Sequence, residues 1–493
     1  MLHILSRDYS SYKYVDESNQ DLDLSFCPIK NRLFHGDKVN SDNTIEYSSI
    51  HRTKQIPGIL VLGKTYGSTN KPLYRFIPDL KHLPIFLVPY EIKASFSKAY
   101  KNKYAVITFK EWPREHPIGS LTETLGDVDS LDAFCEYQLH RRNLVQSLAK
   151  FTSYVKTVLK DEAQCIATIQ QRHQVPNITG EYIFSIDPAT SLDYDDAFSV
   201  KHTGATRYKV TVYIANVYLW LETYDLFKFM TERVSTIYLP DKKRPMLPPL
   251  LSDNYCSLKA GSKRFVYTYS QEFESGQPIG EPQFGTGLVK INKNCAYDDP
   301  DLDKVPGYTV LKQLSNCNDS HDVVANWMVK MNVECAKRGT TIYRGTVNDD
   351  ESLSAKYSLQ PLEHRALNES KYTHITSPIR RLVDIINQAT GPELIGWTNR
   401  LDFINEQCRQ IKRAQMDCDL LAFSMDSTPE MEYEGTIVDI LGCEYSVQFA
   451  CGLRARFKSN AIYKIGTVHQ FKIFVFNDEH TLCKKVRLAV VKN

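Results

Sequence analysis

Four aspartates within ten residues restrict this chain more than any other feature of its sequence. They are Asp187, Asp193, Asp195 and Asp196, and they follow the strand-like run YIFSI. Carboxylates packed so closely repel one another, and a fold keeps them only where water or cations neutralise them. Oxygen-only ligation selects Mg²⁺ or Mn²⁺ over zinc, and two such ions suit phosphodiester hydrolysis. A solvated acidic turn or a calcium loop explains the cluster equally well, although Leu192 and Phe198 stand where an EF-hand needs Gly and Glu.

A second constellation lies in YTHITSPIRRLVDII at 372–386. The Ser-Pro pair at 377–378 predicts a helix start, with Ser as N-cap and Pro in the first position. Arg380 and Arg381 would then occupy the first helical turn, where cations oppose the helix dipole unless an anion meets them. Free backbone N–H groups and two guanidinium groups would form a phosphate site. The pattern alone slightly favours the other explanation, a surface salt bridge between the arginines and Asp384.

A third stretch, 235–265, combines an aromatic residue with cations. The aromatic residue is Tyr238, and the basic residues are Lys242, Lys243, Arg244, Lys259, Lys263 and Arg264. This mixture suits a single-stranded nucleic acid, because bases stack on aromatic rings while cations follow the phosphates. A proline-bent loop with a solvated charged face is the more frequent origin of such runs, so this stretch alone does not decide between the two.

Composition limits the classes of protein that fit. With 493 residues the chain exceeds one hydrophobic core and predicts about three or four domains. A formal net charge of +2 gives no general attraction to polyanions, so any nucleic-acid site must concentrate its cations locally. The twelve cysteines show no zinc or disulfide spacing. Because no secretory segment or membrane-length apolar run is present, we predict a cytoplasmic protein with no membrane partner.

Local patterns indicate how the chain is organised. Short runs rich in β-branched and aromatic residues, such as 58–67 and 103–112, are typical of strands in small barrels. Helical periodicity begins near residue 130 and predicts a helical connector, which a mixed α+β region follows. Alternation returns after residue 428 in five short runs, which predict an OB-type barrel, a common oligonucleotide-binding fold.

The three stretches together resemble the ribonuclease II / ribonuclease R (RNB) family, which includes the exosome-type exonucleases. The motifs that carry the resemblance are IDPATSLDYDDA at 186–197, MLPPLLSDNYCSL at 246–258 and YTHITSPIRRL at 372–382. One short motif can arise by chance, whereas three in this order are highly specific. The likeness extends to NRLFHGDKV at 31–39 and EWPREHPIGSLTETLGD at 111–127, which are similar to the family's cold-shock barrels.

The resemblance implies a multi-domain α+β fold with two N-terminal cold-shock (OB) β-barrels, a mixed α/β catalytic domain and a C-terminal OB β-barrel. With the local patterns, it predicts cold-shock-like domains at 1–56 and 57–128, the helical connector at 129–177, the catalytic domain at 178–427 and the OB-type RNA-binding domain at 428–493. Because no extra nuclease-type domain is seen before the first barrel, we expect a layout closest to the stand-alone exosome-type exonucleases.

The activity implied by the resemblance is hydrolytic 3′-to-5′ exoribonuclease action by two-metal-ion catalysis. The partner would be single-stranded RNA with a free 3′ end, the cofactor Mg²⁺ or Mn²⁺, and the products 5′-nucleoside monophosphates. All four aspartates would hold the metal ions, and Asp195, Asp196 and Arg380 would be catalytic. The residues expected to bind RNA are Tyr238 and Tyr297, which match the family's stacking aromatics, and Thr376, Ser377 and Arg381. We expect the protein to act as a monomer.

Several departures from the family pattern keep a second hypothesis open. The family's HIADVS stands here as YIANVY at 213–218, with Tyr213, Asn216 and Tyr218 replacing His, Asp and Ser. Ala325-Asn326 replace an expected Glu-Glu pair, Gln388 replaces a His, and the second aromatic of the base clamp has no clear counterpart. The alternative is therefore a catalytically weakened or inactive RNA-binding member of the family. A DNA nuclease or general phosphodiesterase is the weaker third option, since such channels suit recognition of the ribose 2′-hydroxyl.

Overall fold

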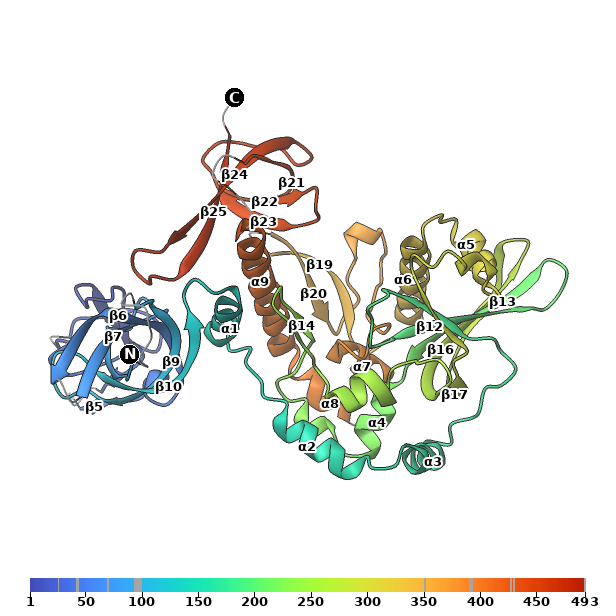
Figure 1. The fold of residues 1–493 in the computed structure, drawn as a ribbon, viewed down its shortest axis with the longest axis horizontal. Helices are drawn as coiled ribbons and strands as arrows, with labels where there is room; N and C mark the ends of the chain where they lie inside the picture. Colours follow the sequence, from blue (N-terminus) through green and yellow to red (C-terminus); the bar gives the residue numbers. More distant parts are fainter. Residues whose placement is uncertain are drawn as a thin grey trace. The chain divides into compact units, whose positions relative to one another are not determined.

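The computed structural model describes residues 1–24, 26–40, 44–68, 71–92, 100–349, 352–389, 393–425, 428 and 431–491 (Figure 1). They form two compact units. One contains residues 1–145, 239–242 and 410–493, and the other contains residues 146–238 and 243–409. The predicted domain boundary between residues 427 and 428 involves residue 427, which lies outside the described residues.

A closed β-barrel dominates the N-terminal part of the first unit. Its strands are β6 (Ile56–Ser68), β7 (Lys71–Pro78), β8 (Phe86–Pro89), β9 (Lys103–Glu111) and β10 (Ile118–Asp127), in the order β10-β8-β7-β6-β9. The strands predicted at 58–67 and 103–112 are confirmed as parts of β6 and β9. Their apolar side chains point inward, as the complete burial of Ile59, Phe76 and Val88 shows.

The residues before the barrel add their side chains to the same core. They form a three-stranded sheet of β1 (Leu2–Ile4), β2 (Tyr12–Val15) and β3 (Asp21–Leu22), and a pair of β4 (Lys38–Val39) and β5 (Ile45–Glu46). Leu2, Tyr14 and Phe34 belong to one apolar cluster with Phe76 and Phe86 of the barrel. The expected two barrels are thus one closed barrel and smaller sheets that share its core, and the division at residue 56 stays a prediction.

The C-terminal part of the first unit is a five-stranded antiparallel sheet. Its strands are β21 (Tyr433–Leu441), β22 (Glu444–Phe449), β23 (Arg454–Lys458), β24 (Val468–Asn477) and β25 (Lys484–Val490), in the order β23-β22-β21-β24-β25. The five predicted strands are confirmed. The sheet is open, as in the partly open five-stranded OB barrel. Helix α1 (Leu131–Arg141) and residues 410–425 of helix α9 (Leu401–Met425) complete the unit.

The second unit is built on a six-stranded mixed sheet in the order β17-β16-β13-β12-β11-β18. These strands are β11 (Phe184–Asp187), β12 (Asp196–His202), β13 (Arg207–Ala215), β16 (Lys263–Glu274), β17 (Gln277–Lys290) and β18 (Lys293–Ala296). Only the pair β11–β18 is parallel. Helices α5 (Tyr308–Ser315) and α6 (Ser320–Arg338) cover one face (Figure 1). There Leu311 and Trp327 belong to one apolar cluster with Phe184 and Ile214.

The remaining elements of the second unit are short. They are α2 (Ala149–Val158), α3 (Glu162–His173), α4 (Val217–Thr223), α7 (Leu382–Gln388), α8 (Glu393–Thr398) and the β-pairs β14 (Ile237–Tyr238) with β15 (Lys243–Arg244) and β19 (Tyr343–Asp349) with β20 (Ser352–Ser358). The helical connector predicted at 129–177 is helical in α1, α2 and α3, and it is divided between the units after residue 145.

Two further features of the fold concern its cysteines and its helices. All twelve cysteines are free thiols in the structure. Among the described residues, no helix combines the length and the apolar character that crossing a bilayer requires.

Candidate active site

The acidic loop connects two neighbouring strands of the mixed sheet. Asp187 is the last residue of β11 and Asp196 the first residue of β12, and the two strands pair antiparallel. The residues between them therefore fold back at the ends of both strands. Tyr297 reaches the same end because β18 pairs with β11, and its N–H donates to the carbonyl oxygen of Asp187 at 3.1 Å.

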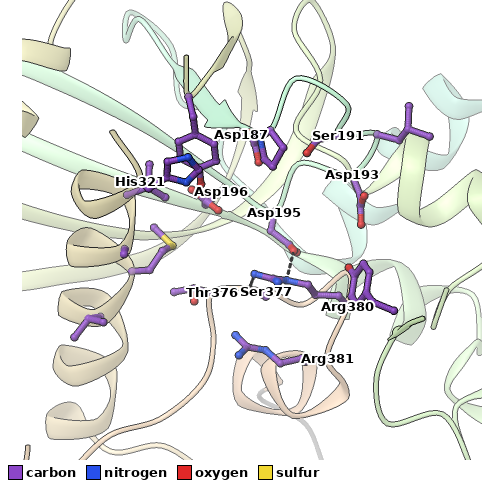
Figure 2. Close-up of a pocket in the computed structure, with 18 of the residues that line it drawn as sticks. Asp187, Ser191, Asp193, Asp195, Asp196, His321, Thr376, Ser377, Arg380 and Arg381 are labelled. Carbon is purple, nitrogen blue, oxygen red and sulfur yellow. Dashed lines mark hydrogen bonds and ion pairs between the residues drawn. The ribbon is translucent and has the colours of Figure 1, made fainter. Parts of the chain in front are cut away.

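All four aspartates line one cavity of about 820 Å³ (Figure 2). The other predicted site residues also line it, namely Tyr238, Tyr297, Thr376, Ser377, Arg380 and Arg381. These residues lie up to almost two hundred positions apart in the sequence, so only the tertiary fold joins them. The structure thus brings every predicted site residue into one cavity, although this placement does not test the role of any of them.

Two of the carboxylates have oxygens without partners. Asp187 Oδ2 and Asp196 Oδ2 are buried and accept no hydrogen bond. Burial raises the pKa of Asp187 to about 7, and repulsion from Asp195 and Asp193 acts in the same direction. Burial and the charge of Asp187 also raise the pKa of Asp196 well above its usual value. A bound cation would remove both causes, since it replaces the lost hydration and offsets the repulsion.

The other two carboxylates are paired with cations of the chain itself. Asp193 accepts from Lys243 Nζ, which lies 2.8 Å from both of its oxygens. Asp195 Oδ2 lies 3.4 Å from Arg380 Nε (Figure 2). Asp195 Oδ1 accepts from the Ile379 N–H at 2.9 Å. Burial raises the pKa of Asp195 to about 6, while Arg380 opposes this shift.

The ion pairs of Asp193 with Lys243 and of Asp195 with Arg380 limit which carboxylates can bind a metal ion. Within the part of the chain that the structure describes, no three His, Cys, Asp or Glu side chains are arranged to hold one ion together. Asp187 and Asp196 nevertheless fit a hard divalent cation, because they offer buried, unpartnered oxygens of the kind that Mg²⁺ prefers. For Asp193 and Asp195 the expected role as metal ligands stays a prediction.

The helix start predicted at Ser377 is wrong. Helix α7 begins at Leu382, and Arg381 occupies the N-cap position without a side-chain capping bond. Residues 378–380 form a turn instead, in which the Ile379 N–H donates to the distant Asp195 and side chains of the same segment take the polar groups of Ser377. The Ser377 N–H donates to Asp384 Oδ1 at 2.7 Å, and Ser377 Oγ accepts from Arg380 Nη2 at 2.9 Å. Arg380 therefore lies outside the helix, and Arg381 at the N-cap is paired with Asp384, so the argument from two unmet cations in the first helical turn no longer supports a phosphate site.

The two arginines are used differently. Arg381 donates to Asp384 at 2.9 Å, and this carboxylate is completely buried, so the expected surface salt bridge is a buried one with Arg381 alone. Arg380 turns instead towards Asp195, and half of its side chain is exposed. Arg380 can therefore reach a ligand in the cavity, whereas Arg381 holds the turn in place.

Aromatic rings line the cavity beside the aspartates. Tyr238 is 43% exposed, so its ring is available for stacking. The ring of Tyr297 stacks on that of His321, with centroids 3.7 Å apart and planes inclined by 15°. Sequence reasoning missed His321. Its only signal was its position in the first turn of α6, two residues after the N-cap Asp319.

A second residue that sequence reasoning missed is Asn332, which is buried in α6. Its Oδ1 accepts from the Ile375 N–H at 3.0 Å, and its Nδ2 lies 3.1 Å from Tyr372 Oη and 3.3 Å from Thr376 Oγ1. Asn332 thus fixes the segment that leads to Arg380.

Gln388, which stands where the RNB family pattern has a His, makes a structural contact. Its side-chain amide donates to the Ala215 carbonyl oxygen at 2.9 Å.

Comparison with known proteins agrees with this architecture. Residues 176–302 and 351–390 match the RNB domain, and residues 73–141 match the Dis3-like cold-shock domain 2 (CSD2). The DIS3-like exonuclease 2 of Schizosaccharomyces pombe is 29% identical over 275 residues, which are 53% of this chain and 29% of that protein. The matched part is therefore less than a third of that relative.

Solved structures share the fold at low sequence identity. Mycoplasma genitalium RNase R in complex with ribose methylated single-stranded RNA has a TM-score of 0.67 and 16% identity, with 91% of each chain covered. Yeast Ssd1, a pseudonuclease, has a TM-score of 0.56 and 15% identity, with 85% of this chain and 66% of that chain covered. The fold is thus the multi-domain α+β fold of ribonuclease R. Residues 176–302 and 351–390 thus form an RNB domain, and the chain is distantly similar to ribonuclease R and the Dis3-like exonucleases.

Proposed function

We propose that the protein is a hydrolytic, metal-dependent 3′-to-5′ exoribonuclease that degrades single-stranded RNA to 5′-nucleoside monophosphates. The observation that carries the proposal is the single cavity in which four aspartates, Arg380 and two tyrosines meet. A general RNA-binding surface needs cations and aromatic rings, but it gains nothing from buried carboxylates that raise one another's pKa. Buried carboxylates of this kind are typical of a catalytic site.

Asp187 and Asp196 would hold a divalent ion, Mg²⁺ or Mn²⁺. Such an ion supplies an activated water and stabilises charge on the transferring phosphoryl group. The chain's own residues would orient the RNA. Arg380 would direct its guanidinium at the phosphate beside the scissile bond, where it acts mainly in the transition state. Tyr238 and Tyr297 would stack on the terminal bases of the strand.

The experiment that tests this proposal is incubation of the protein with 5′-labelled single-stranded RNA in Mg²⁺ or Mn²⁺. We expect a ladder that shortens from the 3′ end, release of 5′-nucleoside monophosphates, and no reaction in excess EDTA. An Asp196→Asn variant prepared in parallel controls for contaminating nucleases. Equal degradation of single-stranded DNA of the same sequence would contradict recognition of the ribose and point to a general phosphodiesterase.

A second candidate function is RNA binding without cleavage. It is favoured by the ion pairs that engage Asp193 and Asp195 and by the replacement of the expected Glu-Glu pair with Ala325-Asn326. The same experiment separates the two functions. Binding of the labelled RNA in a filter or gel assay, with no shortening at any Mg²⁺ or Mn²⁺ concentration, would establish the binding function and refute the nuclease.

A further inference from the structure

Lys243 is the one lysine that lines the cavity of the four aspartates in the described part of the chain. It comes from β15, where it pairs in register with Tyr238 of β14. This pairing fixes the backbone of Lys243 opposite an aromatic residue of the same cavity. The ammonium group lies 5.8 Å from the centroid of the Tyr238 ring, close enough for a cation–π contact.

The ammonium group of Lys243 forms an ion pair with both carboxylate oxygens of Asp193. Its Nζ lies 2.8 Å from Oδ1 and 2.8 Å from Oδ2, so both carboxylate oxygens accept from the same donor. The side chains are only 33% and 15% exposed, which limits screening by water. A divalent ion bound to Asp193 would have to lie next to this ammonium group, and repulsion between the two cations would oppose its binding.

The charges within the cavity agree with this arrangement. If all four carboxylates are ionised when a metal ion is bound, Lys243 on Asp193 and Arg380 on Asp195 offset two of their charges, while Arg381 is paired with Asp384. About two negative charges are left, which one divalent ion neutralises. The unpartnered oxygens of Asp187 and Asp196 mark where that charge lies.

We propose that Lys243 is an internal counter-cation that takes the place of a second metal ion at Asp193, so that the site binds one divalent ion rather than two. The inference rests on the proposed function, since it concerns the same site. It assigns Lys243 a positioning role, because the ammonium group holds Asp193 and sets the charge of the cavity. The sequence alone placed Lys243 only among residues that follow an RNA backbone.

Calorimetric titration of the full chain with Mn²⁺, after removal of metal with EDTA and dialysis, tests the proposal. We expect one ion to bind to the wild-type protein and two to bind to Lys243→Met, which keeps most of the length of the side chain and removes its charge. In the double variant Lys243→Met/Asp193→Asn the second ion should be lost again. Lys242→Met is the matched control from the neighbouring position, where the lysine pairs with Glu136, and it should bind one ion.

Each result decides the question. Two ions in the wild-type protein would mean that Lys243 leaves Asp193 when metal arrives, which overturns the proposal. One ion in both the wild type and Lys243→Met would show that Asp193 is no ligand even when free, with the same consequence. No ion in any variant would overturn the metal-dependent nuclease as well. Cleavage of RNA by a wild type that binds two ions would leave the nuclease standing and refute only the role of Lys243.

Discussion

Replacing Asp187 with Asn gives a test of the metal site that does not depend on activity. Asp187 Oδ2 is buried without a partner, and burial raises the pKa of this carboxyl to about 7 from an ordinary value of 3.8. The charged form is therefore costly in the folded protein. An amide has nearly the same shape and no charge, so the substitution removes this cost while it also removes a metal ligand.

The size of the effect follows from the pKa. A shift of about three units corresponds to about 4 kcal/mol of destabilisation by the charged form, at about 1.4 kcal/mol for each unit. The new amide needs hydrogen bonds of its own, so we expect Asp187→Asn to raise the free energy of unfolding by about 2–3 kcal/mol in EDTA at pH 8. For a unit of this size the melting temperature should rise by about 5–10 °C.

The pH dependence has a definite sign. Because folding raises the pKa of the Asp187 carboxyl, the folded protein favours its protonated form. The free energy of unfolding of the wild type is therefore unaffected by this group below about pH 4 and falls as the pH rises to about 7. Asp187→Asn should therefore be slightly less stable than the wild type near pH 4, where only the cost of the amide remains, gain on the wild type up to about pH 7 and keep a constant advantage above it.

Thermal unfolding followed by circular dichroism, in EDTA and in Mg²⁺, measures these quantities. Mg²⁺ should stabilise the wild type more than the variant, since only the wild type keeps both ligands of the folded site. Asp303→Asn, at an exposed aspartate, is the control and should behave as the wild type in both buffers. A variant that melts below the wild type in EDTA, or that gains equally from Mg²⁺, would refute the reasoning.

Three further predictions concern other parts of the molecule. Arg380→Ala should slow single-turnover cleavage with little loss of stability, and cleavage at the wild-type rate would remove this residue from the site. Asp384→Ala should lower the free energy of unfolding by about 3–5 kcal/mol, because it leaves Arg381 without its buried partner. Tyr238→Ala and Tyr297→Ala should each weaken binding of single-stranded RNA by about 1–3 kcal/mol in a titration, and unchanged binding would place both rings outside the RNA path. Burial lowers the pKa of His82 to about 4, so the free energy of unfolding should fall as the pH drops from about 6.5 to 4. His82→Gln should reduce this fall in acid unfolding curves, and an unchanged fall would mean that the His82 ring is hydrated in the folded protein.

The sequence predicted the parts of the site that are fixed locally. Asp187 and Asp196 flank one loop between strands that pair with each other, so their proximity follows from a short stretch of chain. The strands at 58–67 and 103–112 were predictable for the same reason, since alternation is a property of neighbouring residues.

The parts that could not be predicted depend on distant partners. The contact of Lys243 with Asp193 crosses fifty residues, and nothing in either segment indicates it. Ser377 has the residue type of a helix cap, but the N–H of Ile379 in the following turn donates to Asp195, 184 positions away, and the helix begins only at Leu382. The two-barrel expectation for residues 1–128 differs from the structure because side chains such as Phe34 pack into the neighbouring core rather than closing one of their own.

The parallel pair β11–β18 has a consequence for synthesis of the chain. One edge of β11 pairs with β12, which follows it closely in the sequence. The other edge pairs with β18, where Asn294, the partner of Ser185 in β11, is synthesised 109 residues later. At about 5–20 residues per second, a ribosome needs roughly 5–20 s to deliver that partner. During this interval the strand that ends in Asp187 exposes unpaired backbone groups, which invite pairing with other chains. The acidic loop beside it carries charge that would discourage such pairing, so the residues that form the finished site would also protect the nascent protein.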